Sequence, residues 1–234
     1  MTQDHDNTQN YSEDIASIKT TNVVGQITLA TPWDVWELVP LGRHNPDKFA
    51  NVVIKPKDFN CTFLLYKSGK ILCVGVESPC RNLEMFRPFI TYLEGITGKT
   101  LEFMDFQSNN LVTCFYLKKY CNLLNLAVHW SSVALPGHLV VKYRPDKFPA
   151  ATISVYDPNQ PINKTNKANR FLCTINFFIS RAVVSGRPQF AKNQKYRLDT
   201  VMNLCKPFLQ DERIDHSTLR GRWEKLKHHN LVKV

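Results

Sequence analysis

The chain has 234 residues, of which 43% are hydrophobic and 11% are aromatic, and 30 basic against 20 acidic side chains give it a formal net charge of +10. This length and apolar fraction are sufficient for one large domain or two small ones, and no apolar run approaches the ~18 residues that are needed to cross a membrane. The polar, acidic beginning of the chain is typical of neither a signal peptide nor a transit peptide, so we expect a soluble, globular, basic protein.

The charge is distributed unevenly along the chain. Residues 1–18 contain four acidic and no basic side chains, so the remaining residues carry a net charge of +14. A polar, acidic segment of this kind predicts a disordered tail over residues 1–17. The basic body indicates a polyanionic partner, nucleic acid before a membrane, although a solvated face of lysines would give the same composition.

The first half of the chain alternates strand-like and helical segments. Apolar, β-branched runs predict strands at 22–29, 49–55, 62–68 and 70–76. A short helix is expected to begin at Thr31-Pro32. Ser78 followed by Pro79 is typical of a helix start. A spacing of three to four residues then predicts a helix over 79–96 with an apolar side formed by Leu83, Phe86, Ile90 and Leu93.

The second half repeats this order of elements after roughly 90–110 residues. Strands are expected at 110–117, 148–156, 171–180 and 181–186, and helices at 118–130 and 192–209. The tetrapeptide Pro-Asp-Lys-Phe ends at Phe49 in the first half and at Phe148 in the second. A polar stretch between two strands of the second half predicts an insertion at a hairpin turn. We therefore expect two repeats, 18–101 and 102–210, with the insertion at 159–169, and a C-terminal extension over 211–234.

Side chains two residues apart in a strand share a face of the sheet. This rule groups, on one face, Asn22 with Val24, Leu64 with Tyr66, Leu72 with Val74, Asn110 with Val112, Ile175 with Phe177, and Val183 with Ser185. The opposite face is also apolar, and the helices are expected to pack there. One apolar face is then left without a cover and needs a partner; burial of both faces in a sandwich or a dimer is an equal alternative.

These segments resemble the TATA-binding protein family. The stretch from Asn22 to Gly75, including NPDKFANVVIKPKDFNCTFLLYKSGKILCVG, resembles the first repeat of its core. F-x-D-F-x-x-x-N-x-V from Phe103 to Val112, YRPDKFPAATISVY and INFFISRAVVSG resemble the second repeat. The resemblance runs in order from about Ile18 to Leu209. Its low identity indicates a divergent relative, of the kind expected in a large DNA virus or a protist.

The resemblance implies an α+β saddle, in which two pseudo-symmetric repeats form one curved antiparallel sheet with helices on the convex face. In this family the concave face lies on the minor groove and bends the DNA, which is the established behaviour of these proteins. By position, Asn22 and Asn110 would donate to base acceptors. The floor of the groove would be met by Val24, Leu64, Leu72, Val74, Val112, Ile175, Val183 and Ser185.

The resemblance also implies positions that wedge between base steps and positions that meet phosphates. The wedges would be Phe49 and Tyr66 in the first repeat and Phe148 and Phe177 in the second. Tyr66 departs from the family, because its hydroxyl stands where an apolar tip should insert. Ser154 and Glu77 stand where the family has basic residues, so some phosphate contacts are lost. The phosphate contacts that remain would be made by Lys55, Lys70 and Arg181.

Partner proteins are implied by the loop that precedes Phe148. Arg144, Asp146 and Lys147 lie in this loop, and the family carries acidic residues at the first two positions. In the family, the acidic residue at the position of Arg144 is where transcription factor IIB is engaged, so Arg144 reverses the charge at that contact. The resemblance implies factor IIB-like and IIA-like proteins and RNA polymerase machinery as partners, and neither a membrane nor a small-molecule substrate. In the C-terminal extension, Trp223 and Leu226 predict either an amphipathic docking helix or a solvated basic tail.

The sequence shows none of the patterns that indicate enzymatic chemistry. It has no Ser/His/Asp order, HExxH motif, P-loop or cluster of carboxylates, and Ser68-Gly69-Lys70 is typical of a hairpin turn. His228 and His229 have no partner at a metal-ligand spacing. The seven cysteines contain no CxxC pair and are predicted to be buried small hydrophobes in a reducing compartment. We expect no catalysis, no cofactor and no metal.

Three functions fit these features. The first is a transcription initiation factor that binds and bends A·T-rich promoter DNA through the minor groove and nucleates the pre-initiation complex. The second is a protein-interaction scaffold in transcription that keeps the fold but has lost TATA binding. The third is a related domain that acts on a non-TATA element through a bound partner. The expected location is the nucleus, or a cytoplasmic viral factory if the protein is viral.

Overall fold

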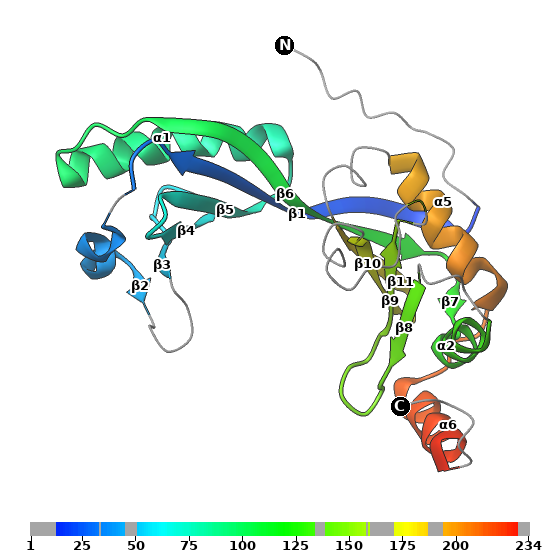
Figure 1. Cartoon of the computed structure of the whole chain (residues 1–234). Coiled ribbons are helices and arrows are strands. Elements are labelled where there is room, and N and C mark those ends of the chain that lie inside the picture. The colour runs from blue at the N-terminus through cyan, green and yellow to red at the C-terminus, as the bar shows by residue number, and fades with distance from the viewer. Residues whose placement is uncertain are drawn as a thin grey trace. The chain divides into compact units, whose positions relative to one another are not determined.

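The computed structural model describes residues 13–32, 34–44, 51–133, 139–157, 159, 171–186 and 194–228. The chain forms two compact units, which we treat separately: Thr20–Val112, called the 20–112 unit, and Met1–Lys19 with Thr113–Val234, called the 113–234 unit. Strands β1 (Ile15–Leu29) and β6 (Phe103–Leu117) contribute to both units (Figure 1). Because β1 begins at Ile15, the disordered tail expected over 1–17 is wrong for its last three residues; residues 1–12 lie outside the described part.

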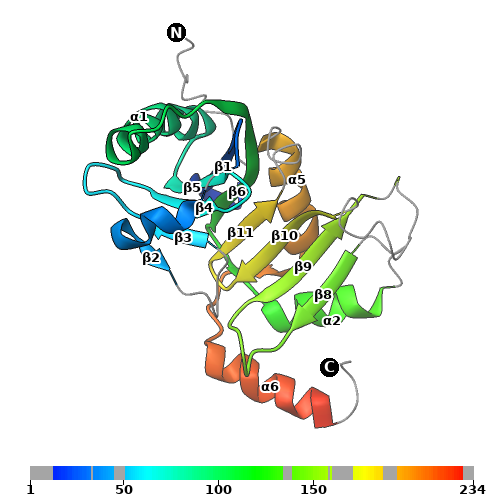
Figure 2. The same cartoon turned by 60° about the vertical axis from the view of Figure 1, so that its left-hand side comes forward.

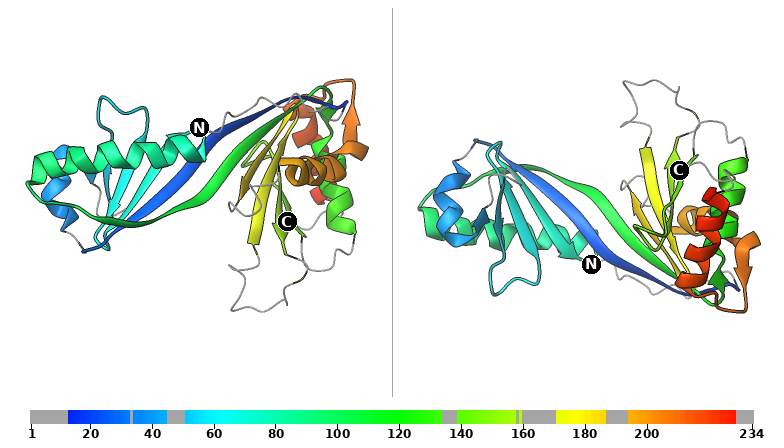
Figure 3. Two further views of the ribbon diagram at one scale, coloured as in Figure 1. Left: turned by 90° about the horizontal axis from the view of Figure 1, so that it is seen from above. Right: turned by 90° about the horizontal axis from the view of Figure 1, so that it is seen from below.

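The 20–112 unit is an antiparallel sheet with one long helix. Its strand order is β2-β3-β4-β5-β1-β6. The elements are η1 (Val35–Leu41), β2 (Arg43–His44), β3 (Asn51–Ile54), β4 (Thr62–Tyr66), β5 (Lys70–Val76) and α1 (Pro79–Thr97). Helix α1 lies in front of the strands in one view of Figure 3 and behind them in the opposite view, so it covers one face of this sheet.

The core of the 20–112 unit lies between α1 and that face. Phe86, Phe89 and Leu93 of α1 are buried against Phe63 and Leu65 of β4. The helix begins as the sequence predicts: the Ser78 hydroxyl accepts a hydrogen bond from the backbone N–H of Arg81 at 3.1 Å, and Pro79 occupies the first turn. It ends at Gly98, whose φ of 65° suits glycine.

One position on the predicted apolar side of α1 is wrong. Leu83 is 44% exposed, and the preceding Asn82 is buried instead. The Asn82 amide donates hydrogen bonds to the backbone carbonyls of Val23 at 3.0 Å and Cys73 at 3.2 Å, so it ties α1 to β1 and β5. A polar residue is therefore accepted in this core because both of its amide hydrogens are satisfied.

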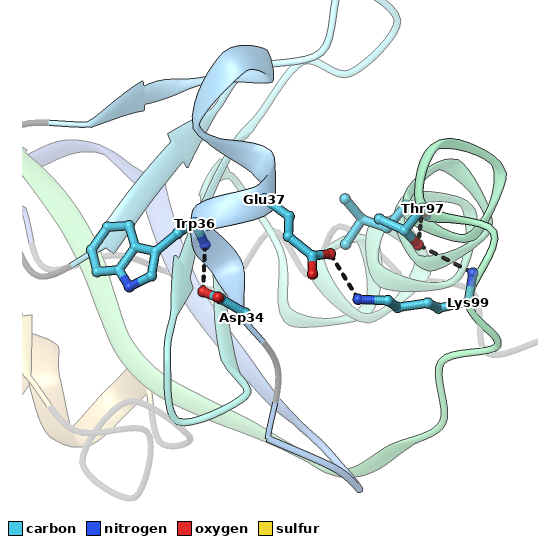
Figure 4. A network of polar contacts seen from close by, with 6 residues as sticks. Asp34, Trp36, Glu37, Thr97 and Lys99 are labelled. Carbon is cyan, nitrogen blue, oxygen red and sulfur yellow. Dashed lines mark hydrogen bonds and ion pairs between the residues drawn. The ribbon is translucent and has the colours of Figure 1, made fainter.

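The short helix expected to begin at Thr31-Pro32 is a 3-10 helix and begins later. Asp34 caps it by accepting a hydrogen bond from the backbone N–H of Trp36 at 3.1 Å (Figure 4). Glu37 of this helix pairs with Lys99, just beyond α1, at 2.7 Å. Pro40 lies inside η1 and removes a backbone donor, which favours a short helix at this place.

The 113–234 unit is built from four consecutive hairpin strands beside β6. Its strand order is β6-β11-β10-β9-β8. The strands are β8 (Leu139–Tyr143), β9 (Ala151–Tyr156), β10 (Phe171–Phe178) and β11 (Arg181–Gly186), and β7 (Tyr120–Cys121) pairs with β12 (Leu209–Gln210) in a small second sheet. Figure 2 shows β8 to β11 side by side, with α2 (Leu123–Ser132) and α5 (Gln194–Cys205) behind them.

Both predicted helices of the second half are shorter than expected. The helix expected over 118–130 begins at Leu123, because Asn122 caps it by accepting from the N–H of Asn125 at 3.1 Å. The helix expected over 192–209 is α5, followed by η3 (Lys206–Phe208), where Pro207 prevents a regular continuation. The insertion predicted at 159–169 lies outside the described residues except for its first residue.

The C-terminal extension forms helix α6 (His216–His228). Trp223 is 2% exposed, and it joins Leu219 in the core of the 113–234 unit, with Leu226 packed against them. The amphipathic alternative is therefore correct, and the helix docks on its own chain. Asp215 lies just before α6 and accepts hydrogen bonds from Ser217 and from the N–H and hydroxyl of Thr218, which hold the pKa of its carboxyl well below the ordinary value.

The seven cysteines are free thiols, and six of them are buried as predicted, whereas Cys80 is exposed. Burial raises the pKa of the Cys173 and Cys205 thiols to about 12. Among the described residues, no three His, Cys, Asp or Glu side chains gather as metal ligands. Within the same part of the chain, no helix has the length and apolar character needed to span a bilayer.

Candidate nucleic-acid interface

The face of the 20–112 sheet that α1 leaves uncovered is lined by half-buried side chains, and we call it the open face of this unit. On β4, on β1 from Asn22 to Leu29 and on β5 from Lys70 to Val74, these side chains alternate with core residues, as strand geometry requires, and the exposed Gly75 interrupts the pattern of β5. Of the predicted DNA-binding residues, the open face carries Asn22, Val24, Leu64, Tyr66, Lys70, Leu72 and Val74. The predicted division of the first-half residues between the two faces is therefore correct.

The cross-strand register arranges the apolar members of this open face in a row. Leu64 of β4 lies opposite Leu72 of β5 and opposite Val53 of β3. Leu72 also lies opposite Gln26 of β1. Directly opposed residues on an antiparallel pair share a face, so Val53, Leu64 and Leu72 form an apolar band across three strands. Val53 was missed in the sequence, although its two-residue offset from Lys55 places it on the same face.

Asn22 is held in one orientation by its own sheet. Its Oδ1 accepts a hydrogen bond of 2.8 Å from the backbone N–H of Gly75. Gly75 has a φ of 95°, which favours glycine, and the β1–β5 register shifts between Val23 and Gly25. Because the amide oxygen is engaged, the Nδ2 end of Asn22 is the end that can donate to a ligand.

Asn110 and Val112 lie half-buried on β6. Close to them, the Asn109 amide donates to Gln26 Oε1 at 2.6 Å, and the Thr21 hydroxyl donates to the Val112 carbonyl at 3.5 Å. These bonds join β6 to β1 within the 20–112 unit. Lys55 is exposed just after β3, and the wedge candidate Phe49 lies outside the described residues.

The 113–234 sheet also has a face packed on helices and an open face. Ile153, Ile175 and Val184 face the helices and are buried with residues of α2 and α5. The alternating, half-buried residues of the open face are Thr152, Ser154, Tyr156, Thr174, Asn176, Phe178, Val183 and Ser185. Val183 and Ser185 were predicted to lie on this face and do so.

The prediction that Ile175 and Phe177 share this face is wrong. Both side chains are 0% exposed and belong to the core. The hairpin between β10 and β11 turns through two residues, 179–180, whereas the hairpin between β4 and β5 turns through three, 67–69. The sequence comparison matched Gly186 with Gly75 and assumed equal turns, so it assigned the position of Tyr66 to Phe177 instead of Phe178. Such a shift by one residue moves every side chain of the strand to the other face.

Phe178 takes the place that was assigned to Phe177. Its ring packs edge-to-face with that of Phe148, with centroids 5.9 Å apart and planes at 71°. Phe148 is 45% exposed, and the guanidinium of Arg181 lies 5.0 Å from the Phe178 ring centroid. This edge of the open face thus carries an aromatic pair beside an exposed cation. The signal in the sequence that could have identified Phe178 is the alternation along β10, which puts Phe178 on one face with the polar Thr174 and Asn176.

The loop that precedes Phe148 is organised by Arg144. Its guanidinium bonds to both carboxylate oxygens of Asp146, at 3.2 and 3.1 Å, and lies 6.0 Å from the Trp223 ring centroid of α6. The bond from Arg144 lowers the pKa of the Asp146 carboxyl. The Arg144 carbonyl also accepts from the N–H groups of Lys147 and Phe148. Arg144 and Asp146 are therefore paired with each other, and Lys147 is exposed.

Comparison with known proteins gives consistent matches. The family model described as transcription factor TFIID (or TATA-binding protein, TBP) matches residues 17–96. A TATA-box-binding protein of Tetrahymena thermophila is 28% identical over 141 residues, which cover 59% of this chain and 54% of the relative. TATA-box-binding protein 2 of Methanosarcina mazei is 26% identical over 146 residues, covering 61% of this chain and 76% of the relative. The chain thus spans about half the length of the Tetrahymena relative.

A solved structure shows the same fold. The Methanococcus jannaschii TBP superposes with a TM-score of 0.56 at 19% identity, covering 82% of this chain and 99% of that one. Sequence identity at this level supports the fold alone. The α+β fold expected from the sequence is confirmed by this match.

Proposed function

We propose that the chain is a divergent TBP-like protein that binds A·T-rich promoter DNA in the minor groove, bends it and nucleates transcription initiation. The observation that supports this most directly is the apolar band of Val53, Leu64 and Leu72 on the open face of the 20–112 unit. A row of branched apolar side chains excludes water and offers no acceptor to the guanine amino group. Such a surface suits a groove floor made of A·T pairs.

Asn22 supplies the polar contact that this apolar surface needs. A·T pairs present only acceptors in the minor groove, the adenine N3 and the thymine O2. Asn22 has its oxygen engaged by the Gly75 N–H, so its amide hydrogens are available to such acceptors. Asn110 is proposed to act in the same way from β6. These amides fix the register of the protein on the groove without distinguishing A·T from T·A.

Bending is proposed to come from aromatic side chains at the ends of the open faces. In the 113–234 unit the pair is Phe148 and Phe178. In the 20–112 unit the wedge is Tyr66, and Phe49, which lies outside the described residues, is proposed as its partner from its position in the sequence alone. An aromatic wedge that enters a base step unstacks it at a cost of a few kcal/mol, which the larger wrapped surface offsets. Lys55, Lys70 and Arg181 are proposed to contact phosphates, which adds affinity that falls with salt.

We propose factor IIB-like and IIA-like proteins and RNA polymerase machinery as partners, in a nucleus or, for a viral protein, in a cytoplasmic factory. The contact with a IIB-like factor would use Lys147, because Arg144 and Asp146 are already paired with each other. Lys147→Glu is expected to weaken capture of such a factor on a DNA-bound complex without changing DNA affinity. Equal capture by both proteins would remove the loop from the contact.

The experiment that tests the function measures binding and bending together. A duplex with a central A·T-rich site carries a donor and an acceptor dye at its two ends, and energy transfer is followed as protein and salt are varied. We expect saturable binding with increased transfer, and weaker binding to a duplex of the same length whose site is G·C throughout. The full-chain variant Leu64→Lys is expected to abolish both binding and bending. Its matched control is Leu83→Lys, on the exposed side of α1, which is expected to bind and bend DNA like the wild type. Wild-type protein that bends none of the A·T-rich duplexes at any salt concentration supports the scaffold alternative instead.

A further inference from the structure

The two open faces differ in chemistry at equivalent positions. Positions can be matched by counting inward from the two hairpin turns, which are flanked by Tyr66 and Lys70 in one unit and by Phe178 and Arg181 in the other. Two residues inward, the 20–112 unit has the pair Leu64 and Leu72. At the same place the 113–234 unit has Asn176 and Val183.

The next strand continues the difference. Leu64 lies opposite Val53 of β3, whereas Asn176 lies opposite Thr152 of β9. The apolar pair Val53 and Leu64 in one unit is thus replaced by a threonine and an asparagine in the other. Further along, Thr174 of β10 lies between Ser154 of β9 and Ser185 of β11, so the polar character extends over a second row.

Thr152 and Asn176 form a preorganised polar pair. The Thr152 hydroxyl donates to Asn176 Oδ1 at 2.8 Å, and both residues are half-buried. A hydroxyl whose proton is used in this way presents its oxygen lone pairs to a further donor. The Asn176 amide nitrogen remains a donor, so the pair offers both an acceptor and a donor on the open face.

In the minor groove this combination distinguishes base pairs. The guanine amino group is the one donor that bases present there, whereas all four base pairs present acceptors. An apolar surface excludes a G·C pair because it leaves the amino group buried without a partner. A surface that carries the Thr152–Asn176 pair can accept the guanine amino group and still donate to a pyrimidine O2.

We propose that the two units read different base pairs: the open face of the 20–112 unit requires A·T pairs, and that of the 113–234 unit accepts a G·C pair opposite Thr152 and Asn176. This inference rests on the proposed minor-groove function and specifies its target. The DNA site would be asymmetric, with one A·T half and one half that tolerates G·C. The asymmetry also orients the protein, because only one orientation matches each unit to its half-site.

The test uses three end-labelled duplexes: the first has A·T pairs throughout, the second (the mixed duplex) has one G·C pair in one half, and the third has one G·C pair at the matching place in both halves. We expect affinities within about threefold for the first two and a loss of about tenfold or more for the third, the size of one good base contact. Cys80 is the exposed cysteine of the seven, so a dye on it reports which half the 20–112 unit occupies. On the mixed duplex this dye is expected to lie near the A·T half.

The matched variant is Thr152→Val with Asn176→Leu, which gives the 113–234 unit the apolar pair of the other unit. Its affinity for the mixed duplex is expected to be about tenfold lower than its affinity for the all-A·T one, whereas the wild type binds the two within about threefold. The reciprocal Val53→Thr with Leu64→Asn is expected to tolerate G·C in both halves. Thermal melting verifies that each variant is folded, and the wild-type orientation measurement tests the inference without any variant.

The outcomes distinguish failure of the proposed minor-groove function from failure of the proposed difference in base preference between the two units. Wild-type protein that binds no duplex contradicts the minor-groove function itself. If the wild-type protein binds the all-A·T duplex but loses about tenfold or more in affinity on the mixed duplex, the minor-groove function stands and only the present inference is contradicted. Random orientation of the Cys80 dye on the mixed duplex also contradicts only the present inference.

Discussion

Phe148 and Phe178 pack edge-to-face at one edge of the 113–234 open face, with ring centroids 5.9 Å apart, while the neighbouring Phe177 points into the core. We therefore expect Phe148→Ala with Phe178→Ala to reduce the bend and to weaken binding to A·T-rich duplexes by tenfold or more, because the wedge is removed. End-to-end energy transfer and a binding titration measure both effects. Unchanged bending in this double variant would contradict the assignment of the wedge.

Phe177→Ala is the matched control for the wedge. Phe177 is fully buried against α2 and α5, so its truncation leaves a cavity and should lower the free energy of unfolding by about 3–5 kcal/mol. At temperatures where the variant is still folded, we expect wild-type bending. If Phe177→Ala removed the bend and Phe178→Ala did not, the original assignment from the sequence would be correct after all.

Replacing Tyr66 by phenylalanine is expected to strengthen DNA binding, whereas removal of the wedge is expected to weaken it. Tyr66 is half-buried on the open face of the 20–112 unit, and its hydroxyl must lose water to enter a base step. Tyr66→Phe removes this polar group, and burying an unpartnered hydroxyl costs about 1–3 kcal/mol. We expect the variant to bind severalfold more tightly and to bend the DNA more sharply, in the same energy-transfer assay. Weaker binding by the variant would indicate that the hydroxyl makes a contact of its own with DNA.

The sequence allowed the fold to be predicted in most of its parts because strand periodicity and helix caps are local signals. Ser78 and Pro79 located the start of α1 correctly, and two-residue alternation separated Leu64 and Leu72 from the core. These features depend on neighbours within a few residues, so a single sequence contains them. The same holds for Asn22, whose place on the open face follows from the parity of β1.

The rest depended on geometry that local patterns do not contain. Ile175 and Phe177 were misplaced because a turn shorter by one residue changes the parity of a whole strand, and the adjacent Phe177 and Phe178 place a phenylalanine at the end of β10 in either register. Asn82 was missed because its partners are carbonyls on two distant strands. Trp223 left two alternatives open, since an amphipathic pattern does not say which surface covers it.

Gly25 and Asn82 lie so close that a side chain at Gly25 has no room. A Cβ there would lie 1.9 Å from Asn82 Oδ1 and 2.9 Å from Phe106 Cε2. We expect Gly25→Ala to destabilise the 20–112 unit by about 1–3 kcal/mol through this overlap, and Asn82→Ala to cost about as much through its lost hydrogen bonds. Chemical denaturation gives both values.

The double variant sharpens that prediction. Removing the Asn82 amide creates space for the new methyl group, so Gly25→Ala with Asn82→Ala should cost less than the sum of the two single changes. Leu83→Ala, one residue along α1 and 44% exposed, is the control and is expected to change stability by less than about 0.5 kcal/mol. Strict additivity would mean that the two positions are not coupled.

We expect the stability of α6 docking to depend on pH through Asp215. Hydrogen bonds from Ser217 and Thr218 favour its charged form and depress its pKa in the folded protein. A group with a depressed folded pKa contributes stability above its unfolded pKa, about 3.9 for an aspartate, and loses that contribution as the pH falls further. We expect Asp215→Ala to lower the melting temperature at pH 6 and to lower it by less near pH 3, with the difference vanishing only once the pH falls below the depressed folded pKa. Asp215→Asn keeps a capping oxygen but does not titrate, so it is expected to retain most of the stability at both pH values. An Asp215→Ala deficit that persisted undiminished at low pH would show that the carboxylate charge is not what stabilises the start of α6.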